Sequence, residues 1–199
     1  TRNVPHRGHE YILSHTIEEE LSDGILLHPV VGSKKKGDFN SKYILKSYEF
    51  LMNHCFPQDR YILATFNTYS RYAGPREALF TALCRKNYGC THFIVGRDHT
   101  GFSDHYDEKA SQQLLDGIND LGIEIIPFNE IVYSKEQKTY FQPNNSDKNV
   151  SAKILQFLSG TEYRKRLNHG DPIPEWIVRK EISKMLQDAI LNGEPIFVE

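Results

Sequence analysis

Apolar and polar positions along this chain follow two spacings that alternate, and they predict an alternation of strands and helices. Short apolar runs indicate buried strands, and apolar residues every three to four positions indicate amphipathic helices. The strand-like runs cover residues 24–32, 60–66, 91–96 and 123–128. The helix-like segments cover residues 9–21, 40–54, 75–87 and 108–121. Repeated alternation of this kind predicts an α/β fold with a mainly parallel sheet that helices cover on both faces.

Capping and turn residues sharpen several helix ends. Asn40 or Ser41 is expected to cap the second helix, and Pro75 is expected at the first position of the third. The last part of the chain reads as two helices, over 159–170 and 174–193, with Pro174 at the start of the longer one. We therefore expect an α/β catalytic domain over residues 1–143 and a mostly helical segment over 144–199. Within the latter, 144–149 is expected to be a polar turn or mobile loop.

Composition narrows the classes of function. A length of 199 residues fits one domain, and the net charge of −2 does not favour broad binding to nucleic acid or to a membrane surface. No apolar run approaches the length of a membrane span. Cys55, Cys84 and Cys90 have neither a paired count nor CxxC spacing. This argues against a disulfide framework or a zinc site, and we expect a cytoplasmic protein.

The opening segment, TRNVPHRGHEYI, concentrates hydrogen-bond donors ahead of the first helix. Ligands of open parallel sheets bind beyond the carboxyl ends of strands, so we expect Thr1 to lie just past a first strand. His6 and His9 share one face of a helical turn, and both could donate to phosphate oxygens. Gly8 would allow a nucleotide close to the backbone. Surface or capping histidines, and a metal-binding pair, remain the alternatives.

Three later segments carry similar chemistry. GRDHTG, residues 96–101, follows an apolar strand directly, which favours a ligand loop over an ordinary surface loop with an ion pair. In SRYAGPREAL, residues 70–79, two arginines bracket a Gly-Pro turn and could bind an anion or pair with carboxylates. In LSGTEYRKRL, residues 158–167, Ser159, Thr161 and Arg164 could contact phosphate, although a capping box from Ser159 to Glu162 is favoured.

In this order, the four segments resemble the sulfate adenylyltransferase (ATP sulfurylase) family over essentially the whole chain. The most characteristic stretch is RYAGPREALFTALCRKNYGCTHFIVGRDHTGF. The resemblance implies a Rossmann-like nucleotidyl-transferase fold with an HxGH motif. It also implies the reaction of ATP with sulfate to give adenosine 5′-phosphosulfate and pyrophosphate, with Mg²⁺ accompanying ATP.

The family's site residues carry over by position. The resemblance implies catalytic roles for Thr1, Arg2, Asn3, His6 and His9. It implies ATP binding by Thr1, Arg2, Asn3, Gly96, Arg97, Asp98, His99 and Ile131. Ile131 and its neighbour Phe128 fall where the family has a mobile loop near the adenine, and both are looser matches. It implies sulfate binding by Arg2 and by the backbone of Thr100. We expect the two phosphate-binding segments to converge, so that His6, His9 and His99 face one cleft.

Departures from the family pattern qualify this reading. The family has a Gln directly before Thr1, at the end of a strand, and a further domain before that. We therefore expect this chain, expressed as written, to be weakly active and poorly stable. Thr100 stands where Ala is usual and could narrow the anion pocket; Val4-Pro5 reverses the usual order, and Ser70 replaces a usual Met.

Two alternatives follow from these departures. One is a nucleotidyl-transferase that uses another oxyanion as acceptor. The other is an inactive, truncated module that binds ATP. The partners expected are ATP, sulfate and pyrophosphate, and further candidates are a second copy of the chain and a fused or separate adenylylsulfate kinase.

Overall fold

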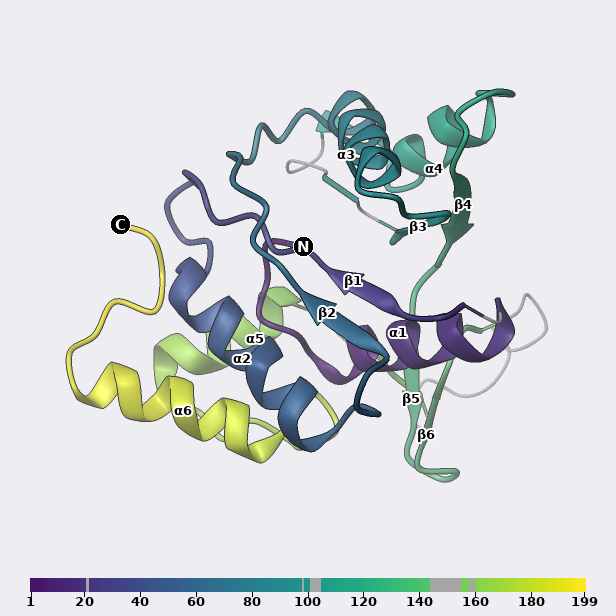
Figure 1. Ribbon diagram of the computed structural model, residues 1–199. Coiled ribbons are helices and arrows are strands. Elements are labelled where there is room, and N and C mark those ends of the chain that lie inside the picture. Colours follow the sequence, from purple (N-terminus) through teal and green to yellow (C-terminus); the bar gives the residue numbers. More distant parts are fainter. Residues whose placement is uncertain (21, 98, 101–104, 144–154, 158–159) are drawn as a thin grey trace. The chain divides into compact units, whose positions relative to one another are not determined.

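The fold is α/β, and the contacts within it divide the chain into two units (Figure 1). The computed structural model describes residues 1–20, 22–97, 99–100, 105–143, 155–157 and 160–199. The first unit comprises Thr1–Ser70 and Val132–Glu199, and the second unit comprises Arg71–Ile131. These boundaries differ from the predicted division between residues 143 and 144.

The first unit is built around a parallel β–α–β element. Strands β1 (Ile25–Leu27) and β2 (Tyr61–Leu63) pair in parallel, and α2 (Ser41–His54) connects them. The Asn40 side chain accepts a hydrogen bond from the Lys42 amide at 3.1 Å, which confirms Asn40 as the helix cap. Helix α1 (Arg7–Glu19) precedes β1 and begins two residues before the expected segment 9–21.

The remainder of the first unit contains a small antiparallel sheet that the hydrophobic pattern did not predict. Strand β5 (Val132–Ser134) lies between β6 (Thr139–Phe141) and β7 (Leu155–Phe157). Two helices follow, α5 (Gly160–His169) and α6 (Lys180–Leu191), and α6 lies beside α2 (Figure 1). Trp176, which lies in the connection from α5 to α6, stacks on Tyr133 with ring centroids 5.6 Å apart.

The second unit repeats the parallel arrangement. Helix α3 (Pro75–Asn87) has the predicted bounds, with Pro75 as its first residue. Strands β3 (His92–Val95) and β4 (Glu124–Pro127) pair in parallel, and α4 (Ala110–Asp116) connects them. Helices α3 and α4 pack against each other. Each of the four predicted parallel strands is thus confirmed, although each is shorter than its apolar run.

Each unit has a hydrophobic core of its own. In the first, α2, α5 and α6 bury Tyr43, Ile44, Leu51, Tyr163, Leu167, Ile182 and Leu186 around Leu27 and Tyr61. In the second, Ala78 and Ala82 of α3 pack with Phe93, Val95, Leu115, Leu121 and Ile123. In the part of the chain that the structure describes, every helix is too short or too polar to traverse a lipid bilayer.

Two predicted helix boundaries were wrong. The last helix starts at Lys180 rather than Pro174, because Pro174–Val178 forms a turn whose Ile177 carbonyl accepts a hydrogen bond from the Arg7 amide at 2.8 Å. Helix α4 ends at Asp116 rather than near Leu121, because Gly117 ends it and Leu121 packs into the core from the turn that follows. The predicted polar turn at 144–149 lies outside the described residues.

Candidate active site

The first predicted cluster of site residues, which comprises Thr1, Arg2, Asn3, His6 and His9, starts at the carboxyl end of β1. The Thr1 carbonyl accepts a hydrogen bond from the Val30 amide at 2.8 Å, and Val30 itself pairs in parallel with Phe66 just beyond β1 and β2. The side chain of Thr1 is hydrogen-bonded to the buried Tyr48 hydroxyl, and burial raises the pKa of Tyr48 to about 12. Thr1 therefore lies where ligands of parallel sheets bind, beyond the strand ends.

His6 and His9 form a compact pair at the N-terminus of α1. His6 is the residue before the helix, and its backbone N–H donates to Nδ1 of His9 at 3.2 Å. The two rings lie 3.8 Å apart between centroids. Nδ1 of His6 is buried and has no hydrogen-bond partner among the described residues. A buried polar nitrogen without a partner is costly in a folded protein, and a bound ligand would satisfy it.

Both rings are neutral at pH 7. Burial lowers the pKa of His9 to about 4, and burial together with neighbouring His9 lowers the pKa of His6 well below its ordinary value. Because Nδ1 of His9 accepts a backbone hydrogen bond, the neutral ring carries its proton on Nε2. His9 can therefore donate one hydrogen bond from Nε2 without introducing a full charge.

Asn3 contacts Arg164, one of the residues for which the sequence allowed a contact with phosphate. Nη2 of Arg164, on α5, donates to Oδ1 of Asn3 at 2.5 Å, and the same nitrogen lies 3.9 Å from the buried carboxylate of Asp38. Arg2, the predicted sulfate contact, is half-buried next to Asn3. Thus three polar residues from distant segments, Asn3, Asp38 and Arg164, meet beside the predicted cluster.

A second group of charges, which sequence reasoning missed, fixes the first turn of α1. The buried carboxylate of Glu10 accepts hydrogen bonds on one oxygen from Nη1 of Arg7 at 2.9 Å and from Nε of Arg179 at 2.9 Å. Glu10 and Arg179 are 169 residues apart in sequence. This group holds α1 against the segment before α6, so it fixes the helical turn that carries the histidine pair.

The predicted second cluster lies in the second unit, directly after β3. A Cβ atom added to Gly96 would meet none of the residues that the structure describes within 4 Å, so these leave space open beside its backbone. Arg97 pairs with Glu130 at 2.7 Å and with Glu108 at 3.5 Å. The His99 ring packs edge-on against Phe93, with centroids 5.4 Å apart. Asp98 lies outside the described residues.

The two positions predicted near the adenine are buried. Phe128 and Ile131 have exposed fractions of 5% and 7%. The Phe128 amide donates to the Val95 carbonyl at 2.8 Å, and the Gln112 side chain donates to the carbonyls of Val95 and Phe128. Gln112 therefore fixes the carboxyl ends of β3 and β4, beside which the predicted adenine contacts lie. Since the two units are described separately, the convergence of His6, His9 and His99 stays a prediction.

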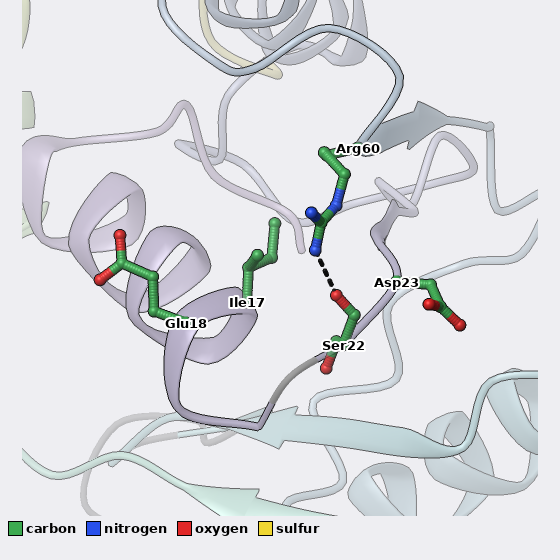
Figure 2. Close-up of a pocket in the computed structure, with 5 residues that line it drawn as sticks. All are labelled: Ile17, Glu18, Ser22, Asp23 and Arg60. Atoms are coloured by element: carbon green, nitrogen blue, oxygen red, sulfur yellow. Dashed lines mark hydrogen bonds between the residues drawn. The ribbon is translucent and has the colours of Figure 1, made fainter.

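Two open hollows in the first unit do not coincide with the histidine pair. Figure 2 shows one of about 520 Å³, lined by Ile17, Glu18, Ser22, Asp23 and Arg60, where Arg60 donates to the Ser22 carbonyl at 2.5 Å. It lies by the last turn of α1, at the opposite end from His6. The other, of about 360 Å³, is lined by Arg7 and Arg179 together with Tyr133, Lys138, Tyr140, Glu175, Trp176, Lys180 and Glu181.

Comparisons with known proteins bear on both units. A family model described as ATP-sulfurylase matches residues 1–189. The sulfate adenylyltransferase of Acaryochloris marina is 42% identical over 192 residues, which cover 96% of this chain and 48% of that protein. That of Pyrococcus abyssi is 40% identical over 187 residues, which cover 94% of this chain and 48% of that protein. The chain thus spans about half the length of the curated relatives it matches.

A solved structure extends the comparison to the fold. The hexameric APS kinase from Thiobacillus denitrificans matches with a TM-score of 0.68 at 23% identity, over 94% of this chain and 35% of that chain. At this identity the likeness shows the α/β fold alone.

Proposed function

Since the chain belongs to the ATP-sulfurylase family, we propose that it carries the catalytic site of a sulfate adenylyltransferase. In this reaction a sulfate oxygen attacks the α-phosphorus of ATP, and the bond from that phosphorus to the β-bridging oxygen breaks. Pyrophosphate leaves with the electron pair, and adenosine 5′-phosphosulfate is formed. Sulfate is already ionised, so no general base is needed, and the protein's task is to position two anions that repel each other.

The observation that carries the proposal is the histidine pair. The Nε2–H of His9 is the donor left available by the bond from His6 to Nδ1, and the partnerless Nδ1 of His6 lies beside it. We propose that these rings bind phosphate oxygens and stabilise the charge that builds up on the leaving oxygen. Donors fixed before the reaction are worth more there than in water, because they need no reorganisation.

Binding of the two anions is assigned to residues around this pair. We propose that Thr1, Arg2 and Asn3 contact the phosphates, and that Arg2 also binds sulfate. Arg164 holds the Asn3 amide and adds positive charge. An arginine suits an oxyanion because its planar guanidinium donates two parallel hydrogen bonds.

In the second unit, Gly96, Arg97, Asp98 and His99 are assigned to the nucleotide, Ile131 to the adenine side, and the backbone of Thr100 to sulfate. The open space beside Gly96 supports a close approach of the nucleotide to the backbone. For the Arg97 side chain the nucleotide would compete with two carboxylates, since Glu130 and Glu108 already pair with its guanidinium. We propose that this ion-pair network holds the loop while its backbone faces the ligand.

The chemistry of the first cluster fits phosphate better than a resident metal ion. Mg²⁺ prefers carboxylate oxygens together with phosphates, whereas the described residues of this cluster offer mainly N–H donors. The Asp38 carboxylate is buried near Arg164. We therefore propose that Mg²⁺ arrives on the phosphates of ATP, as part of the substrate.

The test is formation of ATP from adenosine 5′-phosphosulfate and pyrophosphate by the purified chain, with and without Mg²⁺. Sulfate-dependent release of pyrophosphate is measured in the forward direction, and selenate and molybdate are compared as acceptors. We expect the double variant His6→Ala, His9→Ala to lose activity. His54→Gln, at an exposed histidine of α2, should retain it. Turnover that is unaffected by loss of both histidines would refute the assignment.

We further propose a cytoplasmic location, where ATP and sulfate are both available to a protein with three free cysteines. Assembly with other copies of the chain, and consumption of the product by an adenylylsulfate kinase, complete the proposal. The hexameric state named for the Thiobacillus denitrificans protein supports testing the oligomeric state first.

A further inference from the structure

We propose that Glu77 and the Thr100 hydroxyl are positioning residues, which together hold the nucleotide loop that follows β3. The inference rests on the proposed function, since it gives that loop a ligand. It also assigns to Thr100 a role other than contact with the acceptor through its hydroxyl.

The first link is a carboxylate that holds a strained turn. Glu77, in the first turn of α3, is 5% exposed. Its Oε1 accepts a hydrogen bond from the Arg71 amide at 2.9 Å, and its Oε2 accepts one from the Ala73 amide at 3.1 Å. Tyr72, between these two amides, has a φ of 54°, in the left-handed region that a bulky residue rarely adopts. The carboxylate therefore compensates a backbone shape that is otherwise unfavourable.

The second link joins that turn to the nucleotide loop. The Gly74 amide donates to the Thr100 carbonyl at 3.1 Å, and the Thr100 hydroxyl donates back to the Gly74 carbonyl at 2.7 Å. The hydroxyl also lies 2.6 Å from the His99 carbonyl, so its single proton is shared between two acceptors. Thr100 has a φ of 61°, a conformation that is unusual for a β-branched residue.

Other contacts leave this junction little freedom to relax. The Ser111 hydroxyl, in the first turn of α4, donates to the His99 carbonyl at 2.8 Å. A Cβ atom at Gly74 would lie 2.6 Å from the ring of Tyr106, so only glycine fits there. The loop ending at Thr100 is thus connected to the start of α3 through Glu77 and to the start of α4 through Ser111. A substitution of Glu77 should therefore loosen the backbone at Thr100.

The direction of the Thr100 hydroxyl decides between two roles for the residue. A hydroxyl that selects the acceptor would have to offer its proton to an oxyanion. Here the proton is directed to backbone carbonyls of Gly74 and His99. The side chain accordingly fixes the loop, and its hydroxyl does not change the preference for sulfate.

Three substitutions in this chain test the inference. Thr100→Val removes the hydroxyl and keeps the β-branch, and Thr100→Ser keeps the hydroxyl and removes the methyl group. Glu77→Gln keeps the size of the side chain but replaces one acceptor oxygen by an NH₂ group. Glu49→Gln, at an exposed position of α2, is the control for loss of a negative charge. The readouts are amide hydrogen exchange over residues 71–74, kcat, and the KM values for ATP and for sulfate.

We expect Thr100→Val and Glu77→Gln to speed exchange over 71–74 by about tenfold, the worth of one hydrogen bond. Both should raise the KM for ATP and lower kcat. Thr100→Ser keeps the hydroxyl and should therefore keep the slow exchange over 71–74, and Glu49→Gln should resemble the unchanged chain in exchange and in turnover. In the double variant the losses should be less than additive, because both changes break the same connection. The ratio of activities with sulfate and selenate should stay the same in Thr100→Val, which lacks the hydroxyl.

Three results would overturn the inference. They are unchanged exchange in Thr100→Val, equally fast exchange in Thr100→Ser, and an acceptor ratio that shifts in Thr100→Val. If the unchanged chain forms no adenosine 5′-phosphosulfate, the proposed function fails, and the exchange rates still decide whether Glu77 and Thr100 fix the loop.

Discussion

Replacement of His9 by asparagine separates the two roles that the structure gives this ring. The Oδ1 atom of asparagine can take the place of Nδ1 and accept the hydrogen bond from the His6 amide. The start of α1 should therefore be preserved at neutral pH. The variant lacks Nε2, and with it the donor that we assign to phosphate. The asparagine side chain at position 9 also has no group that titrates between pH 4 and pH 7.

The magnitude follows from the lowered pKa of His9. The folded chain holds the ring neutral with a pKa of about 4, against an ordinary value of 6.5. The unfolded chain therefore binds more protons below pH 6.5, and the free energy of unfolding falls as the pH drops through 6.5 toward 4. The loss that comes from this ring is roughly 2 kcal/mol at pH 5 and roughly 3 kcal/mol at pH 4.

Urea unfolding at pH 7, 5 and 4 measures this term. His9→Asn should lose less stability on acidification than the unchanged chain, and the difference between them should approach the amounts given above. His54→Gln, at an exposed histidine of α2, is the matched control and should follow the unchanged chain. In the adenylylation assay His9→Asn should lower kcat by roughly 10²–10³-fold, as expected for one transition-state donor.

Two results would refute the reasoning. If His9→Asn and the unchanged chain lose stability in parallel from pH 7 to pH 4, the ring of His9 is not held neutral by burial. If the variant keeps its kcat and loses only affinity for ATP, Nε2 contacts the ground state and not the leaving oxygen.

Further substitutions test other contacts. Gly96→Ala should leave the melting temperature unchanged, because a Cβ there meets no atom of the described residues within 4 Å. Calorimetry should show weaker ATP binding by this variant, and equal affinity would contradict close approach of the nucleotide. Arg164→Lys should raise the KM for ATP by about tenfold, because lysine lacks the fork that reaches Asn3, and an unchanged KM would remove Arg164 from the site. Glu10→Gln should lower the free energy of unfolding, measured in urea, by roughly 1–3 kcal/mol, because it weakens the hydrogen bonds of two arginines. Glu49→Gln is the control, and an unchanged free energy in Glu10→Gln would show that these pairs do not stabilise α1.

Local chemistry was sufficient to predict much of this fold. Helix α3 has its predicted bounds because proline favours the first helical turn, and Asn40 caps α2 through its own side chain. The four parallel strands were predicted because their apolar runs are buried and short. The histidine pair was predicted for the same kind of reason, since a spacing of three residues at a helix start brings two rings together.

The contacts that escaped prediction depend on distant segments. The turn at Pro174–Val178 has the apolar spacing of a helix, but its Ile177 carbonyl bonds to Arg7 from the other end of the chain. Strand β5 is only three residues long and is stabilised by pairing with β7. Arg164 and Asn3 are 161 residues apart, so nothing in either neighbourhood indicates that they meet.

The stacking of Trp176 on Tyr133 has a spectroscopic consequence. The chain has one tryptophan, which lies in the first unit, and its carbonyl accepts a hydrogen bond from the Tyr140 hydroxyl at 2.7 Å. Its fluorescence emission will therefore follow thermal unfolding of the first unit. Circular dichroism at about 222 nm reports on all helices and will follow unfolding of both units. If the two curves coincide, the units melt as one cooperative body; if they separate, the second unit melts independently of the histidine pair.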